Sequence, residues 1–178
     1  MFGKNYYWLL FMLLPGSISA QIDWVDYQNN PVIDANFDPG SATILRPSVI
    51  FDGQMYHMWY DKDGGDGEEK MGYATSADGM DWTLVDPVVF ESSSDPNRFD
   101  SIEAGQGWVI AENDSFKMWH MGCQTSNCDL GFAWSTDGIN WTKVDGSGSD
   151  GSVYDRTMDG GTAFALATPT VVKDGDTY

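Results

Sequence analysis

One block of sequence occurs twice in this chain and starts a third time, and this repeat restricts the possible folds more than any single residue does. The two full copies and the third start occupy residues 47–60 with 72–83, residues 107–120 with 131–142, and residues 169–178. The register is close, because 60 residues separate Val49 from Val109 and 62 separate Val109 from Val171. Such a period is typical of solenoids, propellers and arrays, whose single units cannot bury their apolar faces alone.

The repeated unit has the pattern of strands rather than helices. Tyr56, Met58 and Tyr60 alternate with His57 and Trp59, which is a period of two. Asp-Gly pairs tolerate the positive φ angles of tight hairpin turns. Such pairs lie between the apolar runs at Asp52-Gly53, Asp78-Gly79, Asp137-Gly138 and Asp174-Gly175. Strands of the first repeat are expected at residues 48–51, 55–61, 70–76 and 82–89. Four antiparallel strands in about 60 residues predict an all-β fold, a β-propeller with one blade per repeat.

The same repeat predicts how the chain is divided. Residues 21–178 are expected to form about two and a half blades of a propeller, which is of a five-bladed type and monomeric when complete. The expected parts are a closing strand of the last blade at 24–33, blade 1 at 34–95, blade 2 at 96–155 and the start of blade 3 at 156–178. Closing a ring in this way removes an exposed sheet edge. The chain is therefore expected to be a fragment that is not stable as a closed unit by itself.

Residues 1–20 have the pattern of a secretory signal peptide. Lys4 precedes an apolar run at residues 6–14, and mostly small residues lead to a cleavage point after Ala20. The run is too short to span a bilayer. The mature chain is therefore expected to be secreted, periplasmic or otherwise extracytoplasmic, without insertion into a membrane.

The charge of the chain restricts its partners. Removing the leader leaves eight basic residues against 27 acidic ones, a net charge of −19. A surface of this kind repels nucleic acids and anionic membranes. Carbohydrate, a neutral polymer, is compatible with it.

Both cysteines lie in one short loop, at Cys123 and Cys128. In an exported protein, two such cysteines are expected to form a disulfide at a hairpin tip. A metal pair is the alternative, although no histidine or further cysteine lies nearby in the sequence. A structural calcium ion at the Asp-rich residues 61–69 or 145–150 is a further alternative to solvated loops, but neither segment follows the EF-hand pattern. No other cofactor is expected.

Positions that differ between the repeats indicate where function lies, since recurring positions serve the scaffold. At the rim of the expected central pocket, the aligned sets are Arg46 with Gln106 and Thr168, Ser48 with Trp108 and Thr170, and Thr43 with Glu103 and Ala165. Arg46, Gln106 and Trp108 are therefore candidates for substrate binding, and Glu103 is a candidate acid. A surface salt bridge for the charges, and blade packing for Trp108, are the alternatives.

Three aspartates each follow an aromatic residue or methionine before the inner strand of a repeat, namely Asp38, Asp100 and Asp159. Their recurrence favours a turn or capping role. In a catalytic site, Asp100 or Asp159 would be the partner of Glu103. His57 and His120 show no metal-binding spacing, so packing or solvent exposure is expected for both.

These motifs resemble a known group of proteins. The series Pro-Ser-Val-Ile-x-Asp-Gly, Met-Trp-Tyr and Gly-Tyr-Ala-Thr-Ser-x-Asp-Gly-x-x-Trp-Thr is similar to blades of the five-bladed arabinanase, levansucrase and invertase superfamily, which includes glycoside hydrolase families 43 and 32. The resemblance covers residues 24–178. It implies three carboxylates around a central pocket, since glycosidic cleavage needs an acid for the leaving oxygen and a base or nucleophile opposite. At the positions where family 43 commonly has these acids, this chain has Arg46, Gln106 and Ala167.

Two functions are therefore expected from the sequence. The first is an exported glycoside hydrolase or related enzyme that acts on a polysaccharide or oligosaccharide, with Glu103 as the acid. The second is a non-catalytic propeller that binds glycans, with Trp108 as a stacking platform for a sugar ring, or a propeller that binds another surface. A purely structural or protein-binding propeller is a third alternative.

Overall fold

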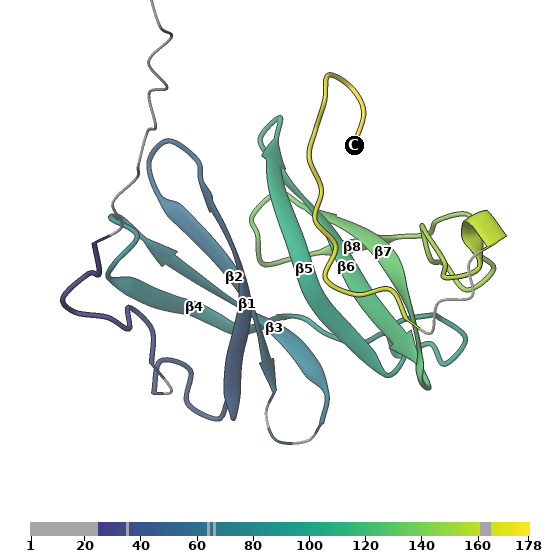
Figure 1. Ribbon diagram of the computed structural model, residues 1–178, viewed down its shortest axis with the longest axis horizontal. Coiled ribbons are helices and arrows are strands. Elements are labelled where there is room, and N and C mark those ends of the chain that lie inside the picture. Colours follow the sequence, from purple (N-terminus) through teal and green to yellow (C-terminus); the bar gives the residue numbers. More distant parts are fainter. Residues whose placement is uncertain (1–24, 35, 64, 66, 161–164) are drawn as a thin grey trace, which may run out of the picture. The chain divides into compact units, whose positions relative to one another are not determined.

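The computed structural model describes residues 25–34, 36–63, 65, 67–160 and 165–178, and its regular structure is almost entirely β (Figure 1). The chain divides into two compact units, residues 1–30 and 31–178, and all strands lie in the second. In the described part of the first unit, the Asn30 amide donates to the Tyr27 carbonyl in a turn. A single 3₁₀ turn, η1 (Met158–Gly160), is the one helical element among the described residues.

The strands form two four-stranded antiparallel sheets in simple sequence order. The first contains β1 (Thr43–Phe51), β2 (Tyr56–Asp63), β3 (Glu69–Ser76) and β4 (Trp82–Phe90). The second contains β5 (Glu103–Glu112), β6 (Ser115–Gln124), β7 (Asn127–Ser135) and β8 (Thr142–Val144). The four strands predicted for the first repeat are confirmed, although β1 begins five residues earlier than expected. Each sheet has the up-and-down order of a propeller blade.

The predicted Asp-Gly turns occupy the hairpins, and their glycines have positive φ at Gly53, Gly79, Gly138 and Gly175. The β7–β8 turn shows why the motif Ser-x-Asp-Gly-x-x-Trp recurs. Asp137 Oδ1 accepts the amide hydrogens of Ile139 and Asn140, and the indole of Trp141 donates to the Gly138 carbonyl at 3.1 Å. Side-chain acceptors thus satisfy backbone groups that the tight turn leaves without strand partners.

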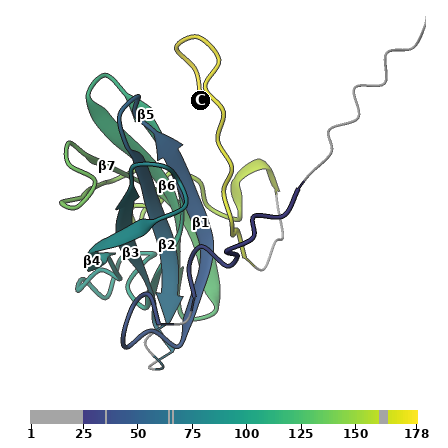
Figure 2. The same ribbon diagram turned by 90° about the vertical axis from the view of Figure 1, so that its left-hand side faces the viewer.

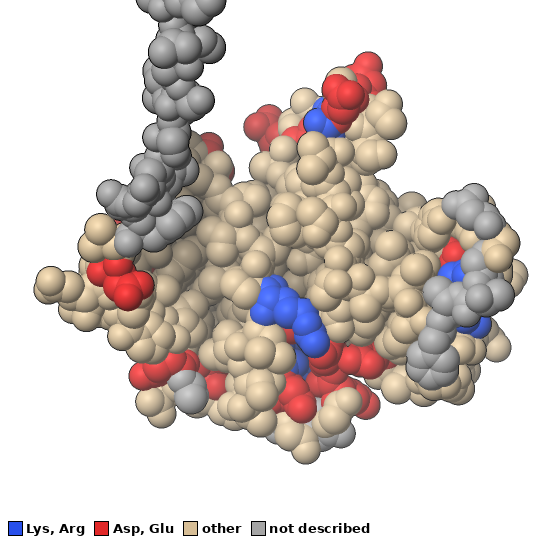
Figure 3. All heavy atoms as spheres, in the orientation of Figure 1, with Lys and Arg blue, Asp and Glu red and all other residues tan. Residues whose placement is uncertain are grey.

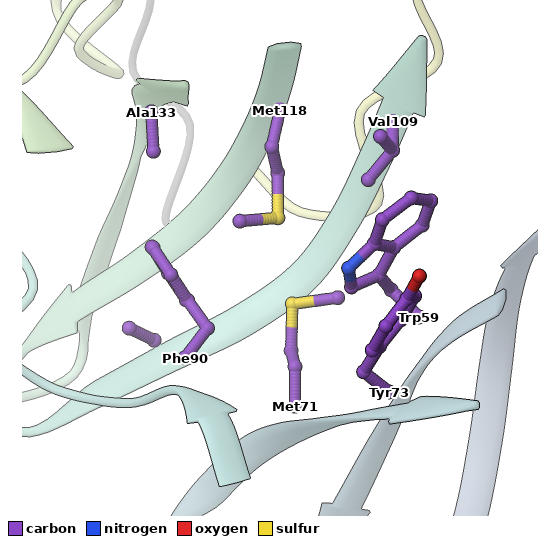
Figure 4. Close-up of a cluster of buried hydrophobic side chains, with 8 residues drawn as sticks. Trp59, Met71, Tyr73, Phe90, Val109, Met118 and Ala133 are labelled. Atoms are coloured by element: carbon purple, nitrogen blue, oxygen red, sulfur yellow. The ribbon is translucent and has the colours of Figure 1, made fainter. Parts of the chain in front are cut away.

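The main core lies between the two sheets (Figure 4). Its labelled side chains are Trp59, Met71, Tyr73 and Phe90 from the first sheet and Val109, Met118 and Ala133 from the second. Burying each large apolar side chain contributes roughly 1.5–3 kcal/mol. Trp59 also donates its indole hydrogen to the Gly138 carbonyl of the second sheet at 2.8 Å. β5 is the strand that contacts β1, β2 and β3, and Figure 2 shows the pair of sheets from the side of the first.

Two expected strands do not form among the described residues. Residues 25–34 form no strand, so the described part of the predicted closing strand at 24–33 is not extended into a sheet. Residues 165–178 form no named strand either; a turn links Asp174 and Thr177 through reciprocal backbone hydrogen bonds. The predicted signal peptide lies outside the described residues. No helix among the described residues is long and apolar enough to cross a membrane.

Candidate functional site

A pocket opens where the two inner strands and the start of the third repeat approach one another. It has a cavity volume of about 180 Å³. Its lining consists of three aligned triplets, Arg46-Pro47-Ser48, Gln106-Gly107-Trp108 and Thr168-Pro169-Thr170. The register inferred from the sequence thus places equivalent residues of each repeat around one cavity. Predicted binding residues Arg46, Gln106 and Trp108 all line it.

The first residue of each triplet has a left-handed backbone. The φ angles are 45° at Arg46, 53° at Gln106 and 49° at Thr168. The pairing of β1 with β2 and of β5 with β6 shifts register at the same places, so each inner strand bulges there. Non-glycine residues in this conformation are uncommon and are found at functional sites when the surroundings hold them. In the first two triplets the regular strand pairing is thus interrupted at residues that line the pocket.

Two carboxylates behind the pocket hold these strained residues. Asp61 Oδ1 accepts the backbone hydrogen of Gln106 at 2.7 Å, and Asp61 Oδ2 lies 3.3 Å from Arg46 Nη1. Glu69 Oε1 accepts from Arg46 Nη1 at 2.7 Å, while its Oε2 accepts from Gln106 Nε2 at 3.2 Å. Gln106 Oε1 in turn accepts the Thr168 amide hydrogen at 3.0 Å. One chain of hydrogen bonds therefore connects the left-handed residues of all three repeats.

Two glycines of β5 make this arrangement possible. A Cβ atom on Gly105 would lie 3.2 Å from Asp61 Oδ1 and 3.5 Å from Glu69. A Cβ atom on Gly107 would lie 2.4 Å from the Met118 sulfur and 2.9 Å from the Met71 sulfur. The Gly107 distances are too short for a real Cβ atom, so a side chain there would displace core methionines, whereas a Cβ atom at Gly105 would make one tight contact with Asp61 and an ordinary one with Glu69. The pocket floor rests directly on the core between the sheets.

Burial changes the acidity of the carboxyl groups in this network. The Asp61 side chain is only 1% exposed, and this burial raises its pKa to about 6, while the Gln106 amide and Arg46 act in the opposite direction. Burial also raises the pKa of Glu103, and the neighbouring charge of Glu69, with which Glu103 shares a hydrogen bond, adds to the rise. A carboxyl group of this kind retains its proton to higher pH than usual. Acidic side chains, with basic atoms among them, gather along the lower edge of the face in Figure 3.

The predicted acids have different surroundings. Glu103 is half-buried at the start of β5, beside Glu69. Asp100 is fully buried and bound by Arg98 Nε at 3.2 Å and Lys143 Nζ at 2.6 Å, and it does not line the pocket, so its catalytic role stays a prediction. Asp38 is likewise buried and accepts from Tyr60 and Lys62. The side chain of Asp159 lies outside what the structure describes.

Sequence reasoning missed Asp61 and Glu69, because residues 61–69 were interpreted as a solvated or calcium-binding loop. Asp61 instead ends up beneath the pocket, and Glu69 pairs with Arg46. The missed signal was a difference between the repeats, since Asp61 aligns with the apolar Met121 and Glu69 with Cys128. No cluster of three potential metal ligands occurs among the described residues.

Cys123 and Cys128 form a disulfide where β6 meets β7. This loop aligns with residues 63–69 of the first sheet, so a covalent link occupies the place that Glu69 has there. The Trp108 ring is fixed by its indole hydrogen, which is donated to the Val171 carbonyl at 2.9 Å. The pocket wall is therefore held in part by residues of the third repeat.

Comparison with known proteins identifies the fold. No protein-family model and no curated protein sequence matches the chain. Among solved structures, a protein of the GH130 family matches with a TM-score of 0.54 at 17% identity over 76% of this chain and 46% of that one. That family is described as mannoside phosphorylases that include glycoside hydrolases targeting β-1,2-mannosidic linkages in Candida mannan. A family 117 glycoside hydrolase from the marine bacterium Zobellia galactanivorans matches with a TM-score of 0.52 at 14% identity over 67% of this chain and 45% of that one.

A further glycoside hydrolase matches with a TM-score of 0.54 at 14% identity, over 66% of this chain and 39% of that one. The chain thus spans less than half the length of each of these structures. At such low identity the likeness establishes the fold alone, which is that of part of a β-propeller.

Proposed function

We propose that this protein is an exported, carbohydrate-active propeller that binds a polysaccharide or oligosaccharide in the Arg46–Trp108–Thr168 pocket and hydrolyses it. The observation that carries the proposal is the pocket itself. Three aligned, strained triplets present one guanidinium, one amide, one indole ring and several hydroxyl groups to a single cavity. Sugars are recognised by such convergent polar groups together with an apolar ring face.

Glu103 is the group best suited to act as the acid. Glycoside hydrolysis requires a protonated carboxyl group for the leaving oxygen and a second carboxylate that acts directly or through water. Burial and the charge of Glu69 favour the protonated form of Glu103 by raising its pKa. Glu69 is 20% exposed and pairs with Arg46 Nη1 at 2.7 Å. Because it shares a hydrogen bond with Glu103, it positions the acid and is too close to be the second carboxylate, which must stand about 5 Å or more away across the scissile bond.

The test is an assay of the whole chain on a panel of plant and algal polysaccharides, with release of reducing sugar as the readout. A Glu103→Gln variant keeps the shape of the side chain but cannot supply a proton. Loss of a general acid typically lowers kcat by about 10²–10⁴-fold. Glu91→Gln, at a residue that the pocket does not include, is the matched control and should retain full activity. Equal activity of Glu103→Gln and wild type would remove Glu103 from the mechanism.

One observation favours a second function, glycan binding without turnover. Within the described part of the chain, no carboxylate lines the cavity directly, and Asp61 is almost inaccessible. A binding protein would show glycan affinity in calorimetry, weakened by Trp108→Ala, with no product from any glycan that binds. Hydrolysis of a bound glycan would exclude this second function.

A further inference from the structure

Asp61 bonds two of the pocket's strained residues at once, as Glu69 does, but Asp61 alone of the two accepts a backbone hydrogen from one of them. Its two oxygens separately receive the Gln106 backbone hydrogen and the Arg46 guanidinium, from the inner strands of two different sheets. Its own exposure is 1%, so it acts on the pocket from below and cannot contact a ligand. The aligned residue of the second sheet is Met121, which shows that the blade itself does not require an acid at this place.

We propose that Asp61 is a positioning residue of the glycan site, which holds the Arg46 guanidinium and the left-handed backbone of Gln106 in place when ionised and releases them when protonated. This inference rests on the proposed binding of glycans at the pocket. An ionised carboxylate accepts from both partners, and hydrogen bonds of this charged kind are about twice as strong as neutral ones. A protonated Asp61 has one oxygen that must donate, and both of its present partners are donors.

The charged groups of the described network around Asp61 come from three strands. Arg46 comes from β1, Glu69 from β3 and Glu103 from β5, next to Glu69. Arg46 favours the ionised form of Asp61, whereas Glu69 and burial favour the protonated form. Because burial raises the pKa of Asp61 to about 6, the change falls within an accessible range of pH.

The experiment measures glycan affinity against pH in the whole chain, for wild type and Asp61→Asn. Asparagine has nearly the same shape and can still accept the Gln106 hydrogen, but it has no charge for Arg46. Wild-type affinity should weaken about fivefold between pH 7 and pH 5, toward a limit of about tenfold at lower pH, and Asp61→Asn should bind about tenfold more weakly at pH 7 with a flat profile in this range. Tenfold corresponds to one unit of pKa difference between the free and bound states.

Asp129→Asn is the matched control. Asp129 is also a buried acid, 3% exposed, which accepts a backbone hydrogen and a guanidinium hydrogen, both from Arg156. It does not line the pocket. This variant should lose stability and yet bind glycan with the wild-type affinity and pH profile. A general loss of stability therefore cannot imitate the expected result for Asp61→Asn.

A second measurement separates this inference from the proposed function. The NMR shift of the Gln106 amide should titrate near pH 6 in the absence of glycan, and this titration should disappear in Asp61→Asn. If the amide titrates but no glycan binds, the proposed function fails and the link between Asp61 and the pocket stands. If glycan binds to wild type and Asp61→Asn with the same affinity and pH profile, the inference is overturned and the proposed function stands.

Discussion

At the scale of single residues, surroundings decide what a side chain does. Arg46 aligns with Gln106 and Thr168, and all three residues have a left-handed backbone. Arg46 is the charged residue of the three, and it pairs with Asp61 and Glu69. Asp100 is fully buried between Arg98 and Lys143, whereas Glu103 begins the next strand beside the pocket network. Three residues of sequence thus separate an acid of the scaffold from a candidate acid of the site.

His120 provides a prediction at this scale. The ring is 1% exposed, stacks on Phe99, and lies 3.1 Å through Nδ1 from the Met121 carbonyl. Burial lowers its pKa to about 4, with the charges of Lys143 and Arg98 acting in the same direction. The neutral ring is thus favoured by folding. Its contribution is complete above about pH 6.5 and is lost as the pH falls toward 4, by up to roughly 3 kcal/mol.

Urea unfolding of wild type and His120→Gln at pH 7 and pH 4.5 measures this contribution. Glutamine can still donate to the Met121 carbonyl but does not titrate, so the variant should lose less of its free energy of unfolding on acidification. Asp61 changes the free energy of unfolding in the opposite direction, because its raised pKa means that its protonation stabilises the folded state. This contribution is present in both proteins, so it cancels when the two are compared. The same acid-induced loss in both proteins would refute the prediction.

At the scale of elements, the Ser-x-Asp-Gly-x-x-Trp turn is the clearest repeated device. Asp78 and Asp137 accept equivalent amide hydrogens, and Trp82 and Trp141 donate to equivalent glycine carbonyls at 3.1 Å. The second turn has further hydrogen bonds, since Asn140 Nδ2 also donates to Asp137 Oδ2 at 2.8 Å. The Gly138 carbonyl also accepts from Trp59 of the other sheet, so the second turn belongs both to its own hairpin and to the interface.

This difference predicts unequal effects of the same substitution. Asp78→Ala removes side-chain hydrogen bonds from one exposed turn and should lower the free energy of unfolding only slightly. Asp137→Ala should cost about 1 kcal/mol more, because a displaced Gly138 carbonyl also disturbs Trp59. Chemical denaturation of both variants decides the matter, and a larger loss for Asp78→Ala would contradict the proposed link.

At the scale of the whole molecule, the contact between the two sheets depends on a few large side chains. Trp59 is fully buried and packs against Tyr73, Phe116 and Trp141. The aligned Trp119 is half-buried and packs against Phe132 and Tyr178. Equivalent tryptophans therefore contribute differently according to what covers them.

Substituting each tryptophan by phenylalanine tests this. Trp59→Phe removes a buried hydrogen bond and part of a packed ring, with an expected loss of about 2–3 kcal/mol in the free energy of unfolding. Trp119→Phe should lose about 1 kcal/mol or less, since its ring is partly hydrated in the folded state. Losses of equal size in urea unfolding would show that the two positions are energetically alike.

Local pattern was sufficient for the blades and their register. Alternation along Tyr56–Tyr60, the Asp-Gly pairs and the regular spacing act over a few residues, so they indicate strands, turns and equivalent positions without a structure. The register even placed Arg46, Gln106 and Trp108 together at one pocket, because aligned residues of neighbouring blades occupy equivalent places.

The tertiary structure alone decided which acids belong to the site. Nothing local distinguishes Asp61 in an Asp-rich stretch from its solvated neighbours, and its role arises from β5, 45 residues away, which buries it and supplies the Gln106 amide. Burial and partners from distant strands determine the ionisation of a carboxyl group. The repeat in the sequence therefore determined the blades and the pocket rim, while packing between the sheets determined the charges beneath it.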